Sequence, residues 1–286
     1  MAYISHKWGR TWYQVRGTKR SKGLPLVCLH GGPGGQSRLM TDLFKLADQR
    51  QVYIYDQLGG GRSSATSRNR WTIKTFVQEL KILVDAWGLD EFHLFGASWG
   101  TTLALEYFLA DRQHHVRSLI FQSPMFSAAD WQRDADQLID QLPAKERKVI
   151  HYCHEIGATD AAVYQQAMEV YYARHVCRNK ARSKLGAKYP NPNGARVYEH
   201  MWGASEFSAT GTLKDYDRTA DLGRINAPTL FICGEHDEAR PATARRYAKQ
   251  IPGASLQVID GASHAILGEK PGRLLKLIRG HLQAND

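Results

Sequence analysis

Residues 92–110, FHLFGASWGTTLALEYFLA, contain the segment on which the fold prediction depends. The apolar run FHLF is typical of a buried strand, and TTLALEYFLA is typical of a helix. Between them GASWG (96–100) places a serine in a turn flanked by small residues. Glycines allow neighbouring backbone to approach a sharp strand-to-helix turn, so the Ser98 hydroxyl is expected to project above the sheet. The pattern predicts a nucleophile elbow, whereas GASWG without its flanks is equally consistent with an ordinary glycine-rich turn.

Short apolar runs alternate with helix-like segments along much of the chain. Segment 75–87 has apolar residues at helical spacing and is followed by Gly88, which indicates a helix end. This alternation favours a mainly parallel sheet with helices on both faces. The strand-like runs are LPLVCLH (24–30), QVYIYD (51–56), FHLFG (92–96), VRSLIFQ (116–122), PTLFICG (228–234) and LQVID (256–260).

The pattern changes between about residues 128 and 215, where polar, aromatic-rich helical segments such as 159–177 precede the turn-rich YPNPNG (189–194). Helices at this point of the chain indicate a cap inserted between two core strands. The sequence therefore predicts the α/β-hydrolase fold, with a core of residues 1–127 and 216–286 and a helical cap of residues 128–215.

Composition narrows the class of protein. No run approaches the roughly 18 apolar residues of a membrane span, and the first residues contain no apolar run of signal-peptide length. We therefore expect an intracellular, cytoplasmic protein without a membrane partner. The four cysteines show no CxxC spacing, which predicts neither disulfides nor a zinc site: Cys28, Cys153, Cys177 and Cys233.

The formal charge of +10 raises the question of an anionic partner. The densest basic stretch is RHVCRNKARSKLGAK (174–188), but no nucleic-acid motif accompanies it, and aromatics are not interleaved as base stacking requires. A charge surplus by itself affects solubility and weak association. We therefore interpret the stretch as a solvated face and expect no nucleic-acid partner.

A serine hydroxyl needs a base to take its proton, and that base needs an acid to hold its tautomer. Asp237 follows the strand-like PTLFICG, and His264 follows the strand-like LQVID, so both are expected beside Ser98 at the carboxyl ends of strands. Their order along the chain is the one typical of this fold. Asp260 and Glu235 are rival acids, but Asp260 is very close in sequence to the histidine. Alone, His264 would be read as a surface histidine.

The loop HGGPGG (30–35) follows a predicted strand where this fold supplies part of an oxyanion hole. We expect the backbone N–H groups of Gly32 and Trp99 to be the donors. A phosphate-binding loop is not indicated, because no Gly-Lys-Ser/Thr follows the glycines. His30 is a possible second base, but at a strand end it is more simply a brace for the loop.

Two further motifs have weaker signals. DQLGGGRS (56–63) is a second glycine-rich strand end and is interpreted, alone, as a turn. His151, His154 and Glu155 have the helical spacing of a metal pair, but no third ligand is signalled. We predict neither a metal nor a cofactor.

Together, HGGPGG, YDQLGGGRS, GASWG, MWGASEF, TGTLKDYD and GEHDE resemble the prolyl aminopeptidase (proline iminopeptidase) family, especially its monomeric, tricorn-interacting members. The resemblance covers about residues 24–270. It implies removal of an amino-terminal residue, often proline, from short peptides by the triad Ser98, Asp237 and His264. It also implies that Glu206 and Glu238 bind the free α-ammonium group of the substrate. Opposite charge and hydrogen-bond acceptors would offset the desolvation of that group.

Some residues leave the specificity open. Tyr198 and Trp202 are possible pocket residues, although an aromatic cap residue often serves packing alone. Ala97 stands where relatives often have glycine or serine, and SHAILGE after the histidine lacks an aromatic residue of close relatives. The same scaffold includes amidases and esterases acting on amino-acid amides or small esters. A non-catalytic ligand-binding protein on the same fold is the third hypothesis.

Overall fold

The chain folds around one twisted sheet of eight strands in the order β1-β2-β4-β3-β5-β6-β7-β8. The computed structural model describes residues 2–112, 115–183 and 189–286, so residues 184–188 of the basic stretch lie outside the described residues. Strand β2 pairs antiparallel with β1 and β4, and the remaining pairs are parallel. The strands are β1 (Ala2–His6), β2 (Gly9–Arg16), β3 (Leu26–Leu29), β4 (Val52–Tyr55), β5 (Phe92–Ala97), β6 (Val116–Gln122), β7 (Thr229–Gly234) and β8 (Ser255–Ile259).

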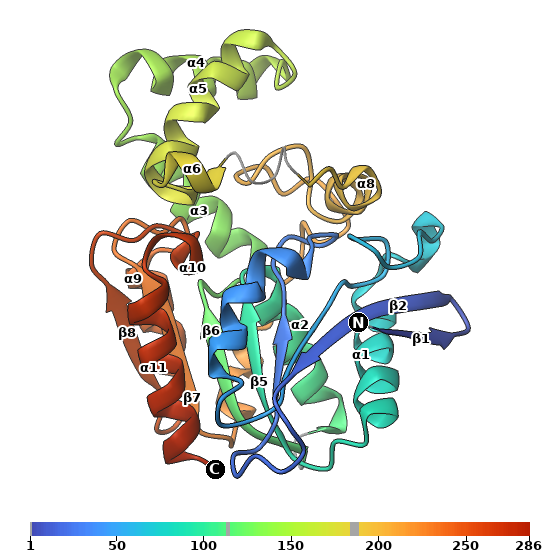
Figure 1. Ribbon diagram of the computed structural model, residues 1–286. Helices are drawn as coiled ribbons and strands as arrows, with labels where there is room; N and C mark the ends of the chain where they lie inside the picture. The colour runs from blue at the N-terminus through green and yellow to red at the C-terminus, as the bar shows by residue number, and fades with distance from the viewer. Residues whose placement is uncertain (1, 113–114, 184–188) are drawn as a thin grey trace.

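Alternate residues of the core strands point to opposite faces of the sheet, as the period of two requires. In β3, Val27 belongs to the apolar cluster beneath α1, α2 and α9, whereas Cys28 belongs to the cluster beneath η1 and α11. The sheet is thus covered on both faces, with α1 and α11 on opposite sides (Figure 1). These elements are η1 (Ser37–Leu46), η2 (Arg68–Arg70), α1 (Ile73–Trp87), α2 (Trp99–Tyr107), η3 (Phe108–Arg112), η6 (Thr219–Arg224), α9 (Pro241–Ala248), α10 (Ile266–Glu269) and α11 (Pro271–Ala284).

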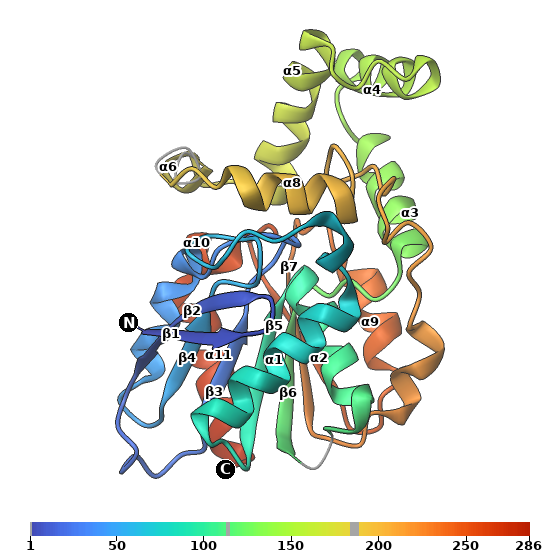
Figure 2. The ribbon, with the colours of Figure 1, turned by 90° about the vertical axis from the view of Figure 1, so that its right-hand side faces the viewer.

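A helical region is inserted between β6 and β7. Its helices have a third apolar cluster of their own, which includes Ile139, Tyr164 and Phe207. Figure 2 shows α8 lying across the carboxyl ends of the core strands, with α4 and α5 farther from the sheet. The inserted elements are α3 (Ala128–Ile139), α4 (Ala144–Ile156), α5 (Ala162–Tyr171), η5 (Tyr172–Val176), α6 (Lys180–Ser183) and α8 (Pro192–Met201).

The predicted fold class is confirmed, including the six core strands and the helix before Gly88. Helix α1 begins where the Thr72 side chain accepts a hydrogen bond from the Thr75 N–H, and it ends at Gly88, whose φ of 66° is left-handed. The β1–β2 hairpin was not predicted. Within the described part of the chain, no helix is both long and apolar enough to cross a membrane.

Candidate active site

Ser98 occupies the turn between β5 and α2, as the sequence predicts. Its backbone has φ 55° and ψ −126°, a conformation that is strained for a residue with a side chain and is typical of a nucleophile elbow. The flanking residues must be glycines for steric reasons. A side chain at Gly96 would clash with the Gly100 carbonyl, and a side chain at Gly100 would clash with the Leu29 carbonyl. The close crossing of β3, β5 and α2 therefore holds the serine above the sheet.

Asp237 and His264 meet at the same edge of the sheet. His264 Nδ1 lies 2.8 Å from Asp237 Oδ1, in the geometry of a hydrogen bond from the ring N–H to the carboxylate. Neither rival acid takes this place, since Asp260 is exposed and Glu235 accepts a hydrogen bond from the Gly261 N–H at 2.8 Å. The structure thus brings together the acid and the histidine that the sequence selected.

Asp237 is held by donors that sequence reasoning missed. Its carboxylate accepts hydrogen bonds from Ser123 Oγ at 2.6 Å and from the N–H groups of Gly234 and Ala239 at 3.2 and 3.0 Å. Ser123 follows β6 with a φ of 53°. The only sign of this role in the sequence is that Ser123 directly follows a core strand. These donors stabilise the charged carboxylate and fix the side that faces His264.

Three carboxylates surround His264. Burial alone would lower the pKa of this histidine, but Asp237, Glu238 and Glu206 outweigh that effect and raise the pKa to about 9. Glu238 Oε1 is 3.8 Å from His264 Nδ1. The three carboxyl groups around His264 make this place suitable for a positively charged group.

Glu238 is buried without a hydrogen-bond partner. The side chain is 1% exposed, and neither carboxylate oxygen has a partner among the described residues. Burial, with the nearby charge of Glu206, raises the pKa of Glu238 well above its usual range. A buried carboxyl group without a hydrogen-bond donor is costly. The opposite charge nearest to it is His264, and the Tyr171 hydroxyl also lowers its pKa. Glu238 is not among the described residues that line the cavities at Ser98.

Glu206 is positioned by two indoles. Its backbone carbonyl accepts hydrogen bonds from Trp131 Nε1 at 2.8 Å and from Trp202 Nε1 at 3.1 Å. Burial raises the pKa of the Glu206 carboxyl, whereas the charge of His264 and a contact with Tyr198 lower it. The MWGASEF motif thus supplies both the acid and one of the tryptophans that hold it.

The two glycine-rich loops brace one another beneath the site. His30 Nε2 accepts a hydrogen bond from the Gln57 N–H at 3.0 Å, and the Gln57 amide oxygen accepts one from Trp99 Nε1 at 2.8 Å. Burial lowers the pKa of His30, which keeps its ring neutral. A side chain at Gly60 would strike the Gly35 carbonyl, so the two loops can lie this close only because residue 60 is a glycine. His30 is therefore a brace, as expected, and DQLGGGRS (56–63) shares that role.

Two cavities meet at Ser98. The larger has a volume of about 310 Å³ and is lined by His264, Glu206 and Gly32 as well as by Ser98. The smaller, of about 20 Å³, is also lined by Glu206 and Gly32. Ser98 also lines it. The remaining lining residues are aromatic or apolar: Pro33, Trp99, Met125, Trp131, Tyr198 and Trp202. The candidate pocket residues Tyr198 and Trp202 thus lie in the smaller cavity.

The inserted region contacts the triad loops directly through η5. The His264 N–H donates to the His175 carbonyl at 3.0 Å, and the Ala265 N–H donates to the Val176 carbonyl at 2.8 Å. His175 Nδ1 also donates to the His236 carbonyl at 3.0 Å, beside Asp237. Sequence reasoning missed His175, since a residue that acts through its backbone leaves no motif.

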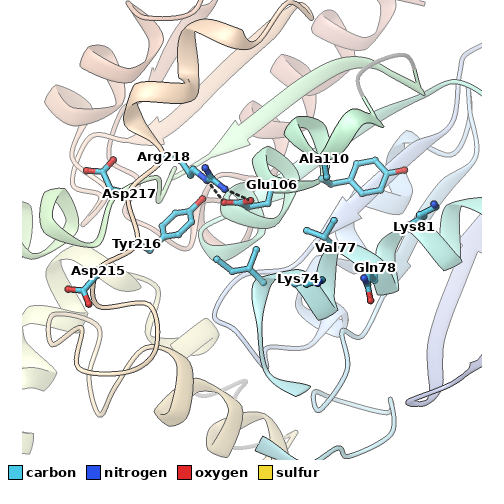
Figure 3. A pocket seen from close by; sticks show the side chains of 12 residues that line it. Lys74, Val77, Gln78, Lys81, Glu106, Ala110, Asp215, Tyr216, Asp217 and Arg218 are labelled. Atoms are coloured by element: carbon cyan, nitrogen blue, oxygen red, sulfur yellow. Dashed lines mark hydrogen bonds and ion pairs between the residues drawn. The ribbon is translucent and has the colours of Figure 1, made fainter. Parts of the chain in front are cut away.

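Other polar clusters lie elsewhere. Another cavity, of about 680 Å³, lies between α1, α2 and residues 215–218 and contains the ion pair Glu106–Arg218 at 2.8 Å (Figure 3). None of the described residues that line it belongs to the predicted triad. His151 and His154 have separate partners, Asp140 Oδ1 at 3.0 Å and the Tyr164 hydroxyl at 2.9 Å. Ser98 and His264 therefore both line the cavity of about 310 Å³, and neither is among the described residues that line the cavity of about 680 Å³.

Comparisons with known proteins agree with this geometry. Residues 25–271 match the alpha/beta hydrolase fold family. The chain is 38% identical to the proline iminopeptidase of Heyndrickxia coagulans over 264 residues, which are 92% of this chain and 91% of that protein. The chain belongs to the proline iminopeptidase family of α/β-hydrolases.

Solved structures extend the likeness to the whole fold. The crystal structure of the proline iminopeptidase of Mycobacterium smegmatis is 32% identical, with a TM-score of 0.88 over 99% of this chain and 98% of that one. The crystal structure of VinJ is 30% identical, with a TM-score of 0.91 over 100% of this chain and 98% of that one. The expected family and the assignment as a serine hydrolase are confirmed.

Proposed function

We propose that this member of the proline iminopeptidase family is a serine aminopeptidase that releases amino-terminal proline, or another small residue, from short peptides. The observation that carries the proposal is the pair of buried carboxyl groups beside His264: Glu206, which lines both cavities at Ser98, and Glu238, which lies 3.8 Å from the histidine. A substrate ammonium group supplies the missing donors and the opposite charge. The family and its proline iminopeptidase members support the same reaction.

In the proposed mechanism Ser98 attacks the first peptide carbonyl while His264 takes its proton and Asp237 holds the ring. The N–H groups of Gly32 and Trp99 receive the developing oxyanion. Trp99 is the first residue of α2, so its N–H has no partner within the helix and lies at the positive end of the helix dipole. His264 then protonates the leaving amine, and water hydrolyses the acyl-enzyme by the same route.

Substrate size follows from the inserted region. We propose that residues 128–215 form a cap that restricts the site to short peptides, since η5 is bonded to the His264 loop and α8 contributes Tyr198 to the smaller cavity. The combination of the six motifs favours the monomeric, tricorn-interacting type, and the mass of the protein in solution tests whether it is a monomer. The cytoplasmic location stays a prediction that cell fractionation tests.

The decisive experiment uses a charged and a neutral substrate of similar size. Glu206→Gln and Glu238→Gln should each reduce kcat/KM for a prolyl arylamide far more than for a neutral ester, because a charge-assisted hydrogen bond contributes about 1.5–3 kcal/mol. That range corresponds to about ten- to 150-fold. Equal losses on both substrates would replace the aminopeptidase assignment with an amidase or esterase. Failure of wild type to react with a covalent serine probe would favour the ligand-binding protein.

A further inference from the structure

The two cavities at Ser98 have unequal access to His264. The larger cavity is lined by His264 and by Ala265, Leu267 and Gly268 of the segment that follows it. The smaller cavity is lined by Trp99 and Gly32, and His264 is not among its described lining residues. Of the two cavities, His264 therefore lines only the larger one.

Acyl transfer requires the leaving amine to meet the protonated histidine, because the imidazole must return the proton to that nitrogen. The leaving part of the substrate must therefore extend into the cavity that contains His264. The amino-terminal residue then occupies the smaller cavity, close to the N–H groups of Gly32 and Trp99. Glu206 lines both cavities, which places it at the junction where the substrate ammonium group lies.

The leaving-group cavity has an apolar wall. Elements η1 and α10 contribute Leu39, Met40 and Leu267 to it. Met40 and Leu267 are 6% and 8% exposed, but Leu39 is 36% exposed. The nearby amide of Gln36 is directed to another partner, donating to the Tyr189 carbonyl at 2.9 Å. A side chain that covers Leu39 would remove apolar surface from water.

We propose that Leu39, Met40 and Leu267 form a specificity site for the second residue of the peptide, which favours a large apolar side chain there. The inference rests on the proposed function, since it assigns the leaving group of that same reaction. The volume of about 310 Å³ accommodates such a side chain. The preferred substrates are short peptides that carry a small first and a bulky apolar second residue.

The test compares dipeptide amides that begin with proline and carry leucine, phenylalanine, glycine or glutamate as the second residue. Prolinamide, whose leaving group is ammonia, is the reference. Wild type should show a kcat/KM about tenfold or more higher for leucine or phenylalanine than for glycine, in the range that apolar pockets provide. Because kcat/KM reports the acylation step, it responds to the leaving group.

Two substitutions of Leu39 test whether the apolar wall causes the preference for an apolar second residue. Leu39→Ala should lower the leucine-to-glycine ratio several-fold, and Leu39→Lys should shift preference toward glutamate by charge attraction. Leu39 is partly exposed, so neither change removes a core side chain. Val163→Ala is the matched control, because Val163 is an apolar residue of α5 that is 56% exposed and lines neither cavity. Its leucine-to-glycine ratio should equal that of wild type.

The possible results distinguish a failure of the proposed second-residue site from a failure of the proposed aminopeptidase activity. Cleavage of prolinamide with equal kcat/KM for all four second residues would overturn the inference and leave the aminopeptidase standing. A Leu39→Ala effect on the choice between proline and alanine as first residue would reverse the assignment of the two cavities and so overturn it. Hydrolysis of neutral esters without cleavage of any prolyl amide would overturn the proposed function, and the inference with it.

Discussion

Replacing Glu238 by glutamine should shift the pH dependence of catalysis toward acid. Burial lowers the pKa of His264, but Asp237, Glu238 and Glu206 raise it to about 9. The histidine acts as a base only when neutral, so kcat/KM of wild type on a neutral ester should fall as the pH drops below about 9. Removing one of the three negative charges lowers the pKa of His264 and moves that limb to lower pH.

The magnitude follows from the separation of the two groups. Glu238 Oε1 lies 3.8 Å from His264 Nδ1. Two unit charges at that distance interact by about 4 kcal/mol at an effective dielectric constant of about 20, equivalent to about 3 pH units. This is an upper bound, because burial and Glu206 raise the pKa of Glu238 itself and so oppose its charged form. We expect a shift of about 1 unit.

The assay is the pH profile of kcat/KM for a neutral aryl ester, whose own charge does not change. Glu235→Gln is the matched control, since Glu235 is a nearby loop residue that is half exposed and bonded to the Gly261 N–H. An acid limb that stays in place in Glu238→Gln would refute the electrostatic reasoning. A shift of equal size in the control would do the same.

Three further changes have defined outcomes. Asp237→Asn should lower kcat by about 10⁴ by favouring the wrong histidine tautomer, as kinetics on a prolyl arylamide would show, whereas Asp260→Asn should not. His175→Ala should lower kcat about tenfold with little effect on KM by loosening the triad loops, and His175→Asn, which keeps a donor, should restore part of it. Burial raises the pKa of Glu79 to about 8, above its unfolded value, so this group stabilises the fold fully below about pH 4.5 and progressively less as the pH rises to 8. Denaturant titrations should therefore show a smaller loss of unfolding free energy over that range in Glu79→Gln.

The core sheet was predictable because buried parallel strands are short apolar runs, each followed by a helical segment. The β1–β2 hairpin was not predictable, because its two strands alternate polar and apolar residues without an Asn-Gly or Asp-Gly turn between them, and β1 is an edge strand. Its turn instead contains Lys7 and Trp8, which are not typical of a two-residue loop.

The sequence indicated which serine, acid and histidine would be neighbours in the fold. Ser98, Asp237 and His264 each follow a core strand, so their meeting at one edge follows from the topology. Trp131 and His175 were not predictable, because their roles depend on how the inserted helices sit over the sheet. The helical period fixes which face of a helix is apolar but not where that helix lies.

The central claim is that Ser98 cleaves substrates selected by a free amino-terminal charge. The most direct measurement is kcat/KM of wild type for a prolyl arylamide against its N-acetylated form, with Ser98→Ala measured beside it. We predict a preference of about a hundredfold or more for the free amine, since a buried polar site rejects an analogue that leaves its groups unpaired, and no turnover by Ser98→Ala. Comparable rates on the two substrates, or wild-type turnover by Ser98→Ala, would contradict the account.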